Sequence, residues 1–217
     1  MKTLKLLLGI SALLTFNACV KHNHNPVAPR QEHYSFVEEF NDNRNNWTFA
    51  DSKNLAYGVI SNGTFKIDYN DNLSEAYYVA KGVNLNINSD FVIQTRIGSN
   101  KNMGLLFGYD VNNPNGSMGY SLMVDYNGYC ALYDEGGNAN GSNLVTLVSP
   151  MQYSFIRRNG DWNEVKLEQN GNRWIGYINN TQVFNVPAAP LYGAGLGFVV
   201  EAQTQGEADY LQADWYQ

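Results

Sequence analysis

Residues 162–187, WNEVKLEQNGNRWIGYINNTQVFNVP, constrain the fold more than any other stretch of the chain. Three short strand-like runs lie there, separated by the turn-forming pairs Asn170-Gly171 and Asn179-Asn180. In the first run Val165 and Leu167 alternate with charged residues, which predicts one face against a core and one face in water. The stretch therefore predicts an antiparallel β-meander.

Similar signals continue over residues 34–217, where strand-like runs alternate with turns rich in Asn and Gly. The 15 Tyr and 20 Gly of the chain favour strands and turns, and no window shows a sustained apolar period of 3.6 residues. We expect one all-β domain, a two-sheet antiparallel sandwich. Near its middle, residues 144–148 and 151–156 are predicted to form two separate short strands.

The hydrophobic pattern also predicts the register of one hairpin, residues 120–134. A two-residue Asn127-Gly128 turn would place apolar residues on both faces. A three-residue turn with Gly128 left-handed instead pairs Leu122 with Leu132 and Val124 with Cys130. We favour this second register, which places Cys130 in the core.

The N-terminus predicts export and lipid anchoring. Lys2 and Lys5 precede a short apolar run, and Ala18 precedes Cys19, a pattern that resembles a bacterial lipoprotein signal. The resemblance implies cleavage after residues 1–18 and acylation of Cys19, including palmitate, at the bacterial outer membrane. An ordinary secretory signal with an incidental cysteine is the alternative.

Residues 19–33 follow as a polar tether with two prolines. Its histidines, His22, His24 and His33, have no neighbouring ligand at metal-binding spacing, so we expect no metal there. Removing 18 of the 217 residues leaves 199, with 12 basic against 20 acidic residues, a net charge of −8. Because the basic residues form no cluster, we expect no nucleic-acid partner.

Three segments of the domain resemble the concanavalin A-like jelly-roll superfamily, which includes laminin G-like modules, family-16 glucanases and the 3-keto-disaccharide hydrolase domain. They are the pattern W-N-x-V-x-L with Asn-Gly and Y-I-N-N, the opening E-F-N-D-N, and G-L-L-F-G-Y-D followed by G-Y-S-L-M-V-D. The resemblance implies a jelly-roll sandwich that binds or hydrolyses carbohydrate.

No catalytic motif is complete. Family-16 glucanases carry E-x-D-x-E on one strand, and the nearest match, Glu164 to Glu168, has Lys166 in place of the aspartate. An ammonium between two carboxylates lowers their pKa values, which disfavours a general acid. We expect a solvated charged face there and no catalytic residues, although carboxylates on different strands, such as Asp125 with Glu201, are left open.

Calcium occurs in related jelly rolls, and the resemblance leaves room for it here. Oxygen-rich loops lie at residues 41–43, 68–72 and 110–113. None of them matches an EF-hand, and Asp and Asn are also the usual residues of turns. The sequence therefore assigns no calcium ligands and no other cofactor.

A ligand is expected on the non-core face of the middle strands, where a cation, an acceptor and several rings would share one surface, as on the sugar-binding face of the superfamily. The candidates are Arg96, Tyr109, Asp125, Tyr129 and Tyr133. The alternative is that another layer covers this face and the tyrosines pack beneath it. The four tryptophans are expected in the core or at its rim.

The function predicted from the sequence is a non-catalytic envelope lipoprotein that binds a glycan or glycoconjugate. Two alternatives remain. A glycoside hydrolase-like enzyme would show a convergent carboxylate pair. A structural or adhesive module that contacts another envelope protein would show an exposed apolar patch.

Overall fold

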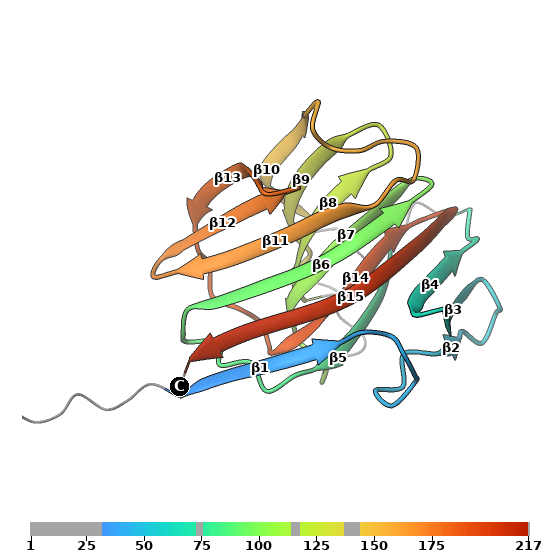
Figure 1. Cartoon of the computed structure of the whole chain (residues 1–217), viewed down its shortest axis with the longest axis horizontal. Helices are drawn as coiled ribbons and strands as arrows, with labels where there is room; N and C mark the ends of the chain where they lie inside the picture. The colour runs from blue at the N-terminus through green and yellow to red at the C-terminus, as the bar shows by residue number, and fades with distance from the viewer. Residues whose placement is uncertain (1–31, 73–75, 114–117, 137–143, 217) are drawn as a thin grey trace, which may run out of the picture. The chain divides into compact units, whose positions relative to one another are not determined.

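A computed structural model describes residues 32–72, 76–113, 118–136 and 144–216, and all of these belong to one compact unit, Gln31–Gln217. Fifteen strands form two antiparallel sheets (Figure 1), and the described residues contain no helix that could cross a membrane. The predicted all-β, two-sheet antiparallel sandwich is confirmed. Cys19 and the signal lie outside the described residues, as does the tether up to residue 31.

The larger sheet has nine strands. They are β1 (His33–Glu38), β2 (Phe49–Ala50), β3 (Ala56–Ser61), β4 (Thr64–Tyr69), β6 (Phe91–Ser99), β11 (Asn163–Asn170), β12 (Arg173–Ile178), β13 (Thr181–Pro187) and β15 (Thr204–Tyr216). The smaller sheet has six strands. They are β5 (Ala76–Gly82), β7 (Asn102–Tyr109), β8 (Tyr120–Asp125), β9 (Tyr129–Asp134), β10 (Val145–Gln152) and β14 (Gly195–Glu201).

The order of the nine-stranded sheet is β13-β12-β11-β6-β15-β4-β3-β2, and that of the six-stranded sheet is β10-β9-β8-β7-β14-β5. The last strand, β15, pairs with β6 on one side. On its other side it pairs with β4 over its first half and with β1 over its second half. β15 therefore joins the two ends of the domain's sequence.

The predicted meander is confirmed as β11, β12 and β13. Gly171 has a φ of 56°, and Asn179 and Asn180 have φ values of 49° and 64°, so both turns use the left-handed conformation that Gly and Asn tolerate. Val165 and Leu167 are buried, as the alternation predicted. The sheets bury their apolar faces against each other, and Phe40, Trp47, Phe65 and Phe198 form one aromatic cluster of the core.

The hairpin of β8 and β9 has the predicted register. Leu122 lies opposite Leu132, Val124 lies opposite Cys130, and Gly128 closes the three-residue turn with a φ of 88°. Cys130 is 3% exposed, so its core placement is confirmed. Burial raises the pKa of the Cys130 thiol to about 12, and the thiol is therefore unreactive in the folded protein.

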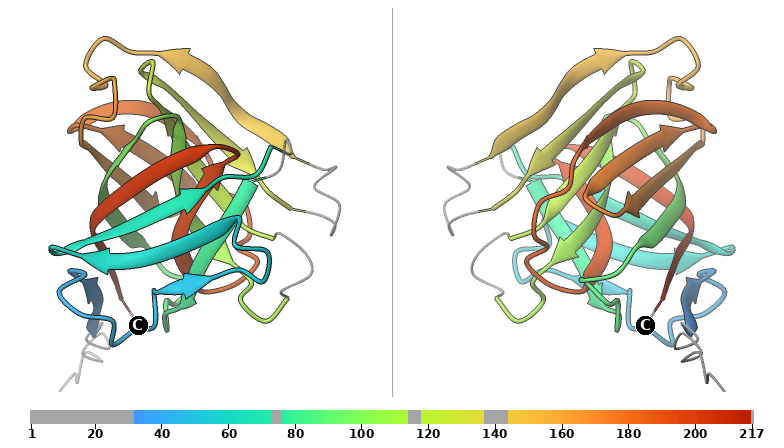
Figure 2. Two further views of the ribbon diagram at one scale, coloured as in Figure 1. Left: turned by 90° about the vertical axis from the view of Figure 1, so that its right-hand side faces the viewer. Right: turned by 90° about the vertical axis from the view of Figure 1, so that its left-hand side faces the viewer.

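One prediction of strand boundaries is wrong. Residues 144–148 and 151–156 do not form two strands, because β10 runs without interruption from Val145 to Gln152. Ser149 and Pro150, which lie between the two predicted strands, form a bulge opposite Ala131. β10 is the terminal strand of its sheet and lies at the margin of the sandwich (Figure 2), where a proline removes no required ladder bond.

Candidate functional site

The predicted ligand-binding residues do not all lie on one surface. Tyr109, Asp125, Tyr129 and Tyr133 belong to the six-stranded sheet, whereas Arg96 is on β6 of the nine-stranded sheet. The expectation of one shared surface is therefore wrong for Arg96. β6 and β7 are consecutive and both central, but the short turn between them crosses from one sheet to the other. Alternation predicted which side of a strand faces the core and could not predict the sheet.

The outer face of the six-stranded sheet, the side away from the core, has a floor of small and apolar side chains. Cross-strand pairing places two rows there: Ala131, Met123, Gly104, Val199 and Tyr78, and then Tyr133, Ser121, Leu106, Gly197 and Ala80. Leu106 and Val199 are 0% and 1% exposed, although they lie outside the core cluster. Other side chains of this face must therefore cover them.

Glu135, directly after β9, is the central polar group of this face. Its carboxylate accepts hydrogen bonds from the hydroxyls of Ser121 on β8 and of Tyr78 on β5, the latter at 2.8 Å. Because β5 and β9 are separated by three strands, this contact crosses the face and covers part of the apolar floor. Burial raises the pKa of Glu135. The two hydrogen bonds favour the ionised form and act in the opposite direction, but burial has the larger effect.

Tyr133 and Glu201 stand beside Glu135. Burial raises the pKa of the Tyr133 phenol, and the negative charges of Glu201 and Glu135 raise it further. The charge of Glu201 also adds to the raised pKa of Glu135. Glu201 is exposed and accepts a hydrogen bond from the side-chain amide of Asn102. These residues form one electrostatically linked group, which we call the Glu135 cluster: Tyr78, Ser121, Tyr133, Glu135 and Glu201.

The other three predicted residues on this sheet differ in whether their side chains are available to a ligand. Tyr109 stacks on Tyr78 with ring centroids 6.3 Å apart, so it packs as the alternative interpretation expected. Asp125 accepts hydrogen bonds from the backbone N–H of Asn127 and of Tyr129, at 2.9 and 2.8 Å, and so caps its own turn. Tyr129 is 39% exposed and remains accessible.

Sequence reasoning missed Tyr78 and Glu135. Glu135 lies one residue beyond the end of β9, where the strand pattern stops. One signal was present, since Glu135 is two residues beyond Tyr133 and therefore continues the alternation onto the same face. Ser121 was correctly placed on this face by the hairpin register, although it was not proposed as a site residue.

The carboxylates of the two outer faces have different partners. On the nine-stranded sheet, Glu164 and Asp209 lie 3.8 and 3.1 Å from Arg96, Glu207 lies 3.1 Å from Lys66, and Glu168 lies 2.7 Å from Lys166. The charged pattern from Glu164 to Glu168 is thus an ion-paired outer face. Within the described part of the chain, Asp125, Glu135 and Glu201 form no ion pair and are held by hydroxyl and N–H groups.

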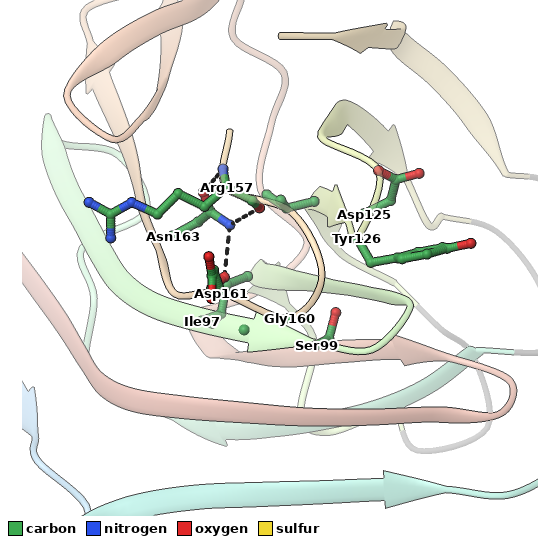
Figure 3. Close-up of a pocket in the computed structure, with 10 residues that line it drawn as sticks. Ile97, Ser99, Asp125, Tyr126, Arg157, Gly160, Asp161 and Asn163 are labelled. Carbon is green, nitrogen blue, oxygen red and sulfur yellow. Dashed lines mark hydrogen bonds between the residues drawn. The ribbon is translucent and has the colours of Figure 1, made fainter. Parts of the chain in front are cut away.

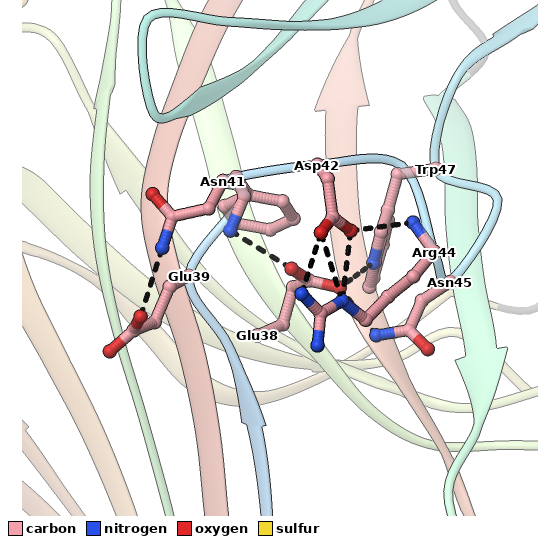
Figure 4. A network of polar contacts seen from close by, with 8 residues as sticks. Glu38, Glu39, Asn41, Asp42, Arg44, Asn45 and Trp47 are labelled. Carbon is pink, nitrogen blue, oxygen red and sulfur yellow. Dashed lines mark hydrogen bonds and ion pairs between the residues drawn. The ribbon is translucent and has the colours of Figure 1, made fainter.

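Glu38 and Glu39 point to opposite sides, as expected for strand neighbours. Glu38 is 4% exposed and accepts hydrogen bonds from the Trp47 indole N–H, the Asn45 amide and the Phe40 backbone N–H, at 2.6 to 2.9 Å (Figure 4). These donors satisfy the buried carboxylate, so Glu38 has a structural role. β1 ends there, and Phe40, with a φ of 51°, turns into the core.

The loops considered for calcium do not assemble a metal site. Asp42 binds the Arg44 guanidinium at 2.6 Å, Asp68 accepts a hydrogen bond from Tyr57, and Asp110 caps the backbone of Asn112. Over residues 32–72, 76–113, 118–136 and 144–216, no three His, Cys, Asp or Glu side chains converge as metal ligands. The described residues therefore provide no ligand set for the calcium ion that the sequence left open. His33 lies 3.1 Å from Asp214, and His22 and His24 fall outside the described residues.

A small cavity lies between the sheets beside the loop at residues 157–161 (Figure 3). Its volume of about 10 Å³ is enough for one water molecule. Asn163 beside it is 3% exposed, and its amide donates to the carbonyls of Arg157 and Asp161 while its oxygen accepts from the Arg157 N–H and from Asn179. Asn163 therefore holds the loop in place, and the cavity beside it is too small for an organic ligand.

Comparisons with known proteins identify the fold. No family model matches the sequence, and a search of curated proteins gives no match. Among solved structures, the endo-β-1,3-glucanase of Pyrococcus furiosus is similar with a TM-score of 0.51 and 11% identity, over 84% of this chain and 94% of that one.

A β-1,3-1,4-glucanase (lichenase) from a mouse hindgut metagenome is similar with a TM-score of 0.52 and 8% identity, over 83% and 98% of the two chains. The CBM2 module of the evolved Dit of Lactobacillus casei BL23 phage J-1 gives 0.51 and 10%, over 86% and 97%. At these identities the similarity concerns the fold. With its two antiparallel sheets and their strand order, this chain has a jelly-roll sandwich fold like that of these three structures.

Proposed function

We propose that the protein binds a glycan through the outer face of the six-stranded sheet, with the Glu135 cluster at the centre of the site. The observation that carries the proposal is that Glu135 and Glu201 lie together on this face with no cationic partner in the described residues. Carboxylates without a bound cation are free to accept hydrogen bonds, which sugar hydroxyls donate. Tyr133 and Tyr129 add rings on the same face.

The similar structures support this ligand class without defining it. Two of the three are glucanases, so other proteins with this fold act on carbohydrate. Fold alone does not determine function. Because Leu106, Met123 and Val199 are buried, the rings of Tyr129 and Tyr133 supply the apolar contact next to the polar groups, a combination that suits the mixed surface of a sugar ring.

A glycan array with the purified protein tests the proposal, using the variants Glu135→Gln and Tyr133→Ala. We expect saturable binding to at least one glycan and at least a tenfold weaker Kd in each variant, on the order of one lost charge-assisted hydrogen bond or ring contact. Glu168→Gln, on the outer face of the other sheet, is the matched control and should bind like the wild type. Binding that survives both changes would place the site elsewhere.

No binding across a broad array would contradict the proposal and favour the adhesive alternative. The exposed apolar side chains of β10 and its preceding residue, Leu144, Val145, Leu147 and Met151, would then be the first contact surface to examine.

A second candidate function, glycoside hydrolysis, is favoured by one specific observation. Glu201 lies close enough for its charge to add to the raised pKa of Glu135, and glycosidases use a pair of neighbouring carboxyl groups. Incubation with glycans that bind, followed by an assay for new reducing ends, tests it. Hydrolysis should disappear in Glu135→Gln and in Glu201→Gln; absence of products from the wild type would leave binding alone.

We propose separately that Cys19 carries the lipid that anchors the protein to the bacterial outer membrane. The support is the sequence pattern of a short apolar run, Ala18 and Cys19. Mass spectrometry of the N-terminal peptide should find an acylated cysteine at the new N-terminus, and labelled palmitate should be incorporated. Cys19→Ser should lose the label and leave the membrane fraction; an unmodified Cys19 in mature protein would contradict the proposal.

A further inference from the structure

A second open cleft lies on the opposite side of the molecule, on the outer face of the nine-stranded sheet. Its volume of about 520 Å³ is within the range of small-molecule sites. Tyr57 on β3 forms one wall and Trp162, just before β11, forms the other, while side chains of β4 and β15 lie between them. We call it the Tyr57/Trp162 cleft.

Trp162 is held in position from two sides. The guanidinium of Arg96 lies 5.3 Å from the centre of its ring, and Arg96 is itself bound to Asp209 at 3.1 Å. The preceding loop is fixed by Asn163, which hydrogen bonds to the carbonyls of Arg157 and Asp161 (Figure 3). Gly98 lets this loop approach β6, because a Cβ there would lie 2.7 Å from the carbonyl oxygen of Gly160.

Tyr57 is held as firmly. Its hydroxyl donates to Oδ2 of Asp68 at 2.6 Å, and the Gln205 side-chain amide donates to the same oxygen at 3.2 Å. Asp68 is 9% exposed, and its other oxygen, Oδ1, is buried without a hydrogen-bond donor among the described residues. A buried acceptor without a donor is unusual, since buried polar groups are nearly always paired, and Asp68 is one of the residues that line the cleft.

Both cations near the cleft are already ion-paired. Lys66 pairs with Glu207 at 3.1 Å and Arg96 pairs with Asp209, and the side chains of these four residues are 37% to 42% exposed. An ion would have to compete with these existing pairs, whereas a neutral ligand with hydroxyl groups can bond to them as they stand. Fixed rings at both walls reduce the conformational entropy lost on binding such a ligand.

We propose that the Tyr57/Trp162 cleft is a second carbohydrate site, which takes a short neutral oligosaccharide with one sugar ring against Trp162 and its hydroxyls toward Lys66, Glu207 and Asp68. The inference rests on the proposed function for the class of ligand and adds a site on the other sheet. The protein would then hold two glycans, or two parts of one long glycan, on opposite faces.

Tryptophan fluorescence reports on this cleft alone, because Trp47 and Trp174 are 0% exposed, Trp215 is 4% exposed and Trp162 is partly exposed. The probes are neutral β-glucan oligosaccharides of four to six sugars, laminari- and cello-oligosaccharides, and manno-oligosaccharides of the same length, titrated into the purified protein. We expect a saturable change in emission from at least one series and protection of Trp162 from acrylamide quenching. Tyr57→Ala should weaken this binding by about tenfold or more, the usual scale of one lost aromatic contact.

Trp162→Ala removes the signal itself, so its binding is followed by calorimetry, with circular dichroism to confirm folding. Tyr177→Ala, an aromatic change on the same outer face beyond the cleft, is the matched control and should keep wild-type affinity. Glu135→Gln with Tyr133→Ala should leave the fluorescence titration unchanged while abolishing binding at the six-stranded sheet.

Three results separate the two proposals. In the first, calorimetry shows one sugar bound per protein, with binding lost only in the Glu135 and Tyr133 variants. That result would overturn the second site and leave the proposed function intact. Binding lost only in Tyr57→Ala and Trp162→Ala would support the cleft and overturn the site at the six-stranded sheet. No change in fluorescence or heat with any of the three series would overturn the cleft, and the wider glycan array would then decide the proposed function by itself.

Discussion

The outer faces of the two sheets carry similar residue types and use them differently. On the nine-stranded sheet the carboxylates Glu164, Glu207 and Asp209 each lie within 4 Å of an Arg or Lys. On the six-stranded sheet Glu135 and Glu201 are bound only by hydroxyl and amide groups of the described residues. The carboxylates named on the first face are ion-paired, whereas those of the second lie without a cation over an apolar floor.

This contrast shows that residue composition alone does not reveal a site. Both faces offer tyrosines and carboxylates, and on the six-stranded sheet burial raises the pKa of the Glu135 carboxyl group. The nine-stranded sheet offers its aromatic rings, Tyr57 and Trp162, at the walls of an open cleft. The two faces should therefore differ in their response to mutation, pH and salt.

The largest expected effect comes from glycines. An alanine Cβ at Gly197 would press on the carbonyl oxygen of Val79 and lie 2.7 Å from the Cα of Ala80, so β14 and β5 would have to separate. We expect Gly197→Ala to lower the free energy of unfolding by about 3 kcal/mol. Gly98→Ala meets only a loop carbonyl, which can move, and should cost about 1 kcal/mol. Urea unfolding measures both, and equal losses would contradict the difference in rigidity between the two sites.

The pH dependence of stability should distinguish Glu135. Its pKa is raised in the folded protein, so the carboxyl contributes stability below about pH 4.3, its usual pKa, and this contribution is lost as pH rises through the raised pKa. Glu135→Gln should remove that loss, so the stability of the variant relative to the wild type should rise from pH 4 to pH 8.

Tyr78→Phe provides the complementary variant for this prediction. It removes a hydroxyl that favours the ionised form of Glu135, so the pKa of Glu135 should rise further. The loss of stability with rising pH should therefore be larger than in the wild type. Denaturant titrations at several pH values, with wild type and both variants in parallel, measure the effect. A difference between wild type and Glu135→Gln that does not change with pH would contradict the raised pKa.

Arg96→Met should affect binding more than folding. The Arg96 side chain is 38% exposed, so losing its ion pairs should change the free energy of unfolding by less than about 0.5 kcal/mol. Trp162 loses the cation over its ring, and we expect a weakening of sugar binding in the Tyr57/Trp162 cleft of about threefold. Binding at the six-stranded sheet should not change. A variant that weakens both sites equally would show that the faces are coupled.

The smallest effect is expected for Lys66 and Glu207. Both side chains are 42% exposed, and a pair so accessible to water contributes little. A double-mutant cycle with Lys66→Met and Glu207→Gln should give a coupling energy of about 0.3 kcal/mol that disappears in 1 M salt. A coupling above about 1 kcal/mol would mean that this face is less hydrated than its exposure indicates.

The sequence predicted local structure well, because strand alternation and turn chemistry act over a few residues. The meander, the three-residue turn at Gly128 and the burial of Cys130 all follow from such patterns. Sheet membership depends on where a connection crosses the sandwich, and strand alternation does not reveal that point. The sequence prediction therefore grouped Arg96 with residues of the other sheet. The position of Glu135 depends on Ser121 and Tyr78, which are 14 and 57 residues away in the sequence, and no local pattern records that contact.

The position of β15 has a consequence for how the protein is made. This strand contains the last residues of the domain, Thr204–Tyr216, and pairs with β6, β4 and β1. Before β15 has been synthesised, the chain can form the local hairpins but cannot join β1 or β4 to the rest of the nine-stranded sheet. Completion of the larger sheet is thus deferred until all of β15 has been synthesised, and this dependence on distant pairings is typical of slowly folding β-sandwiches.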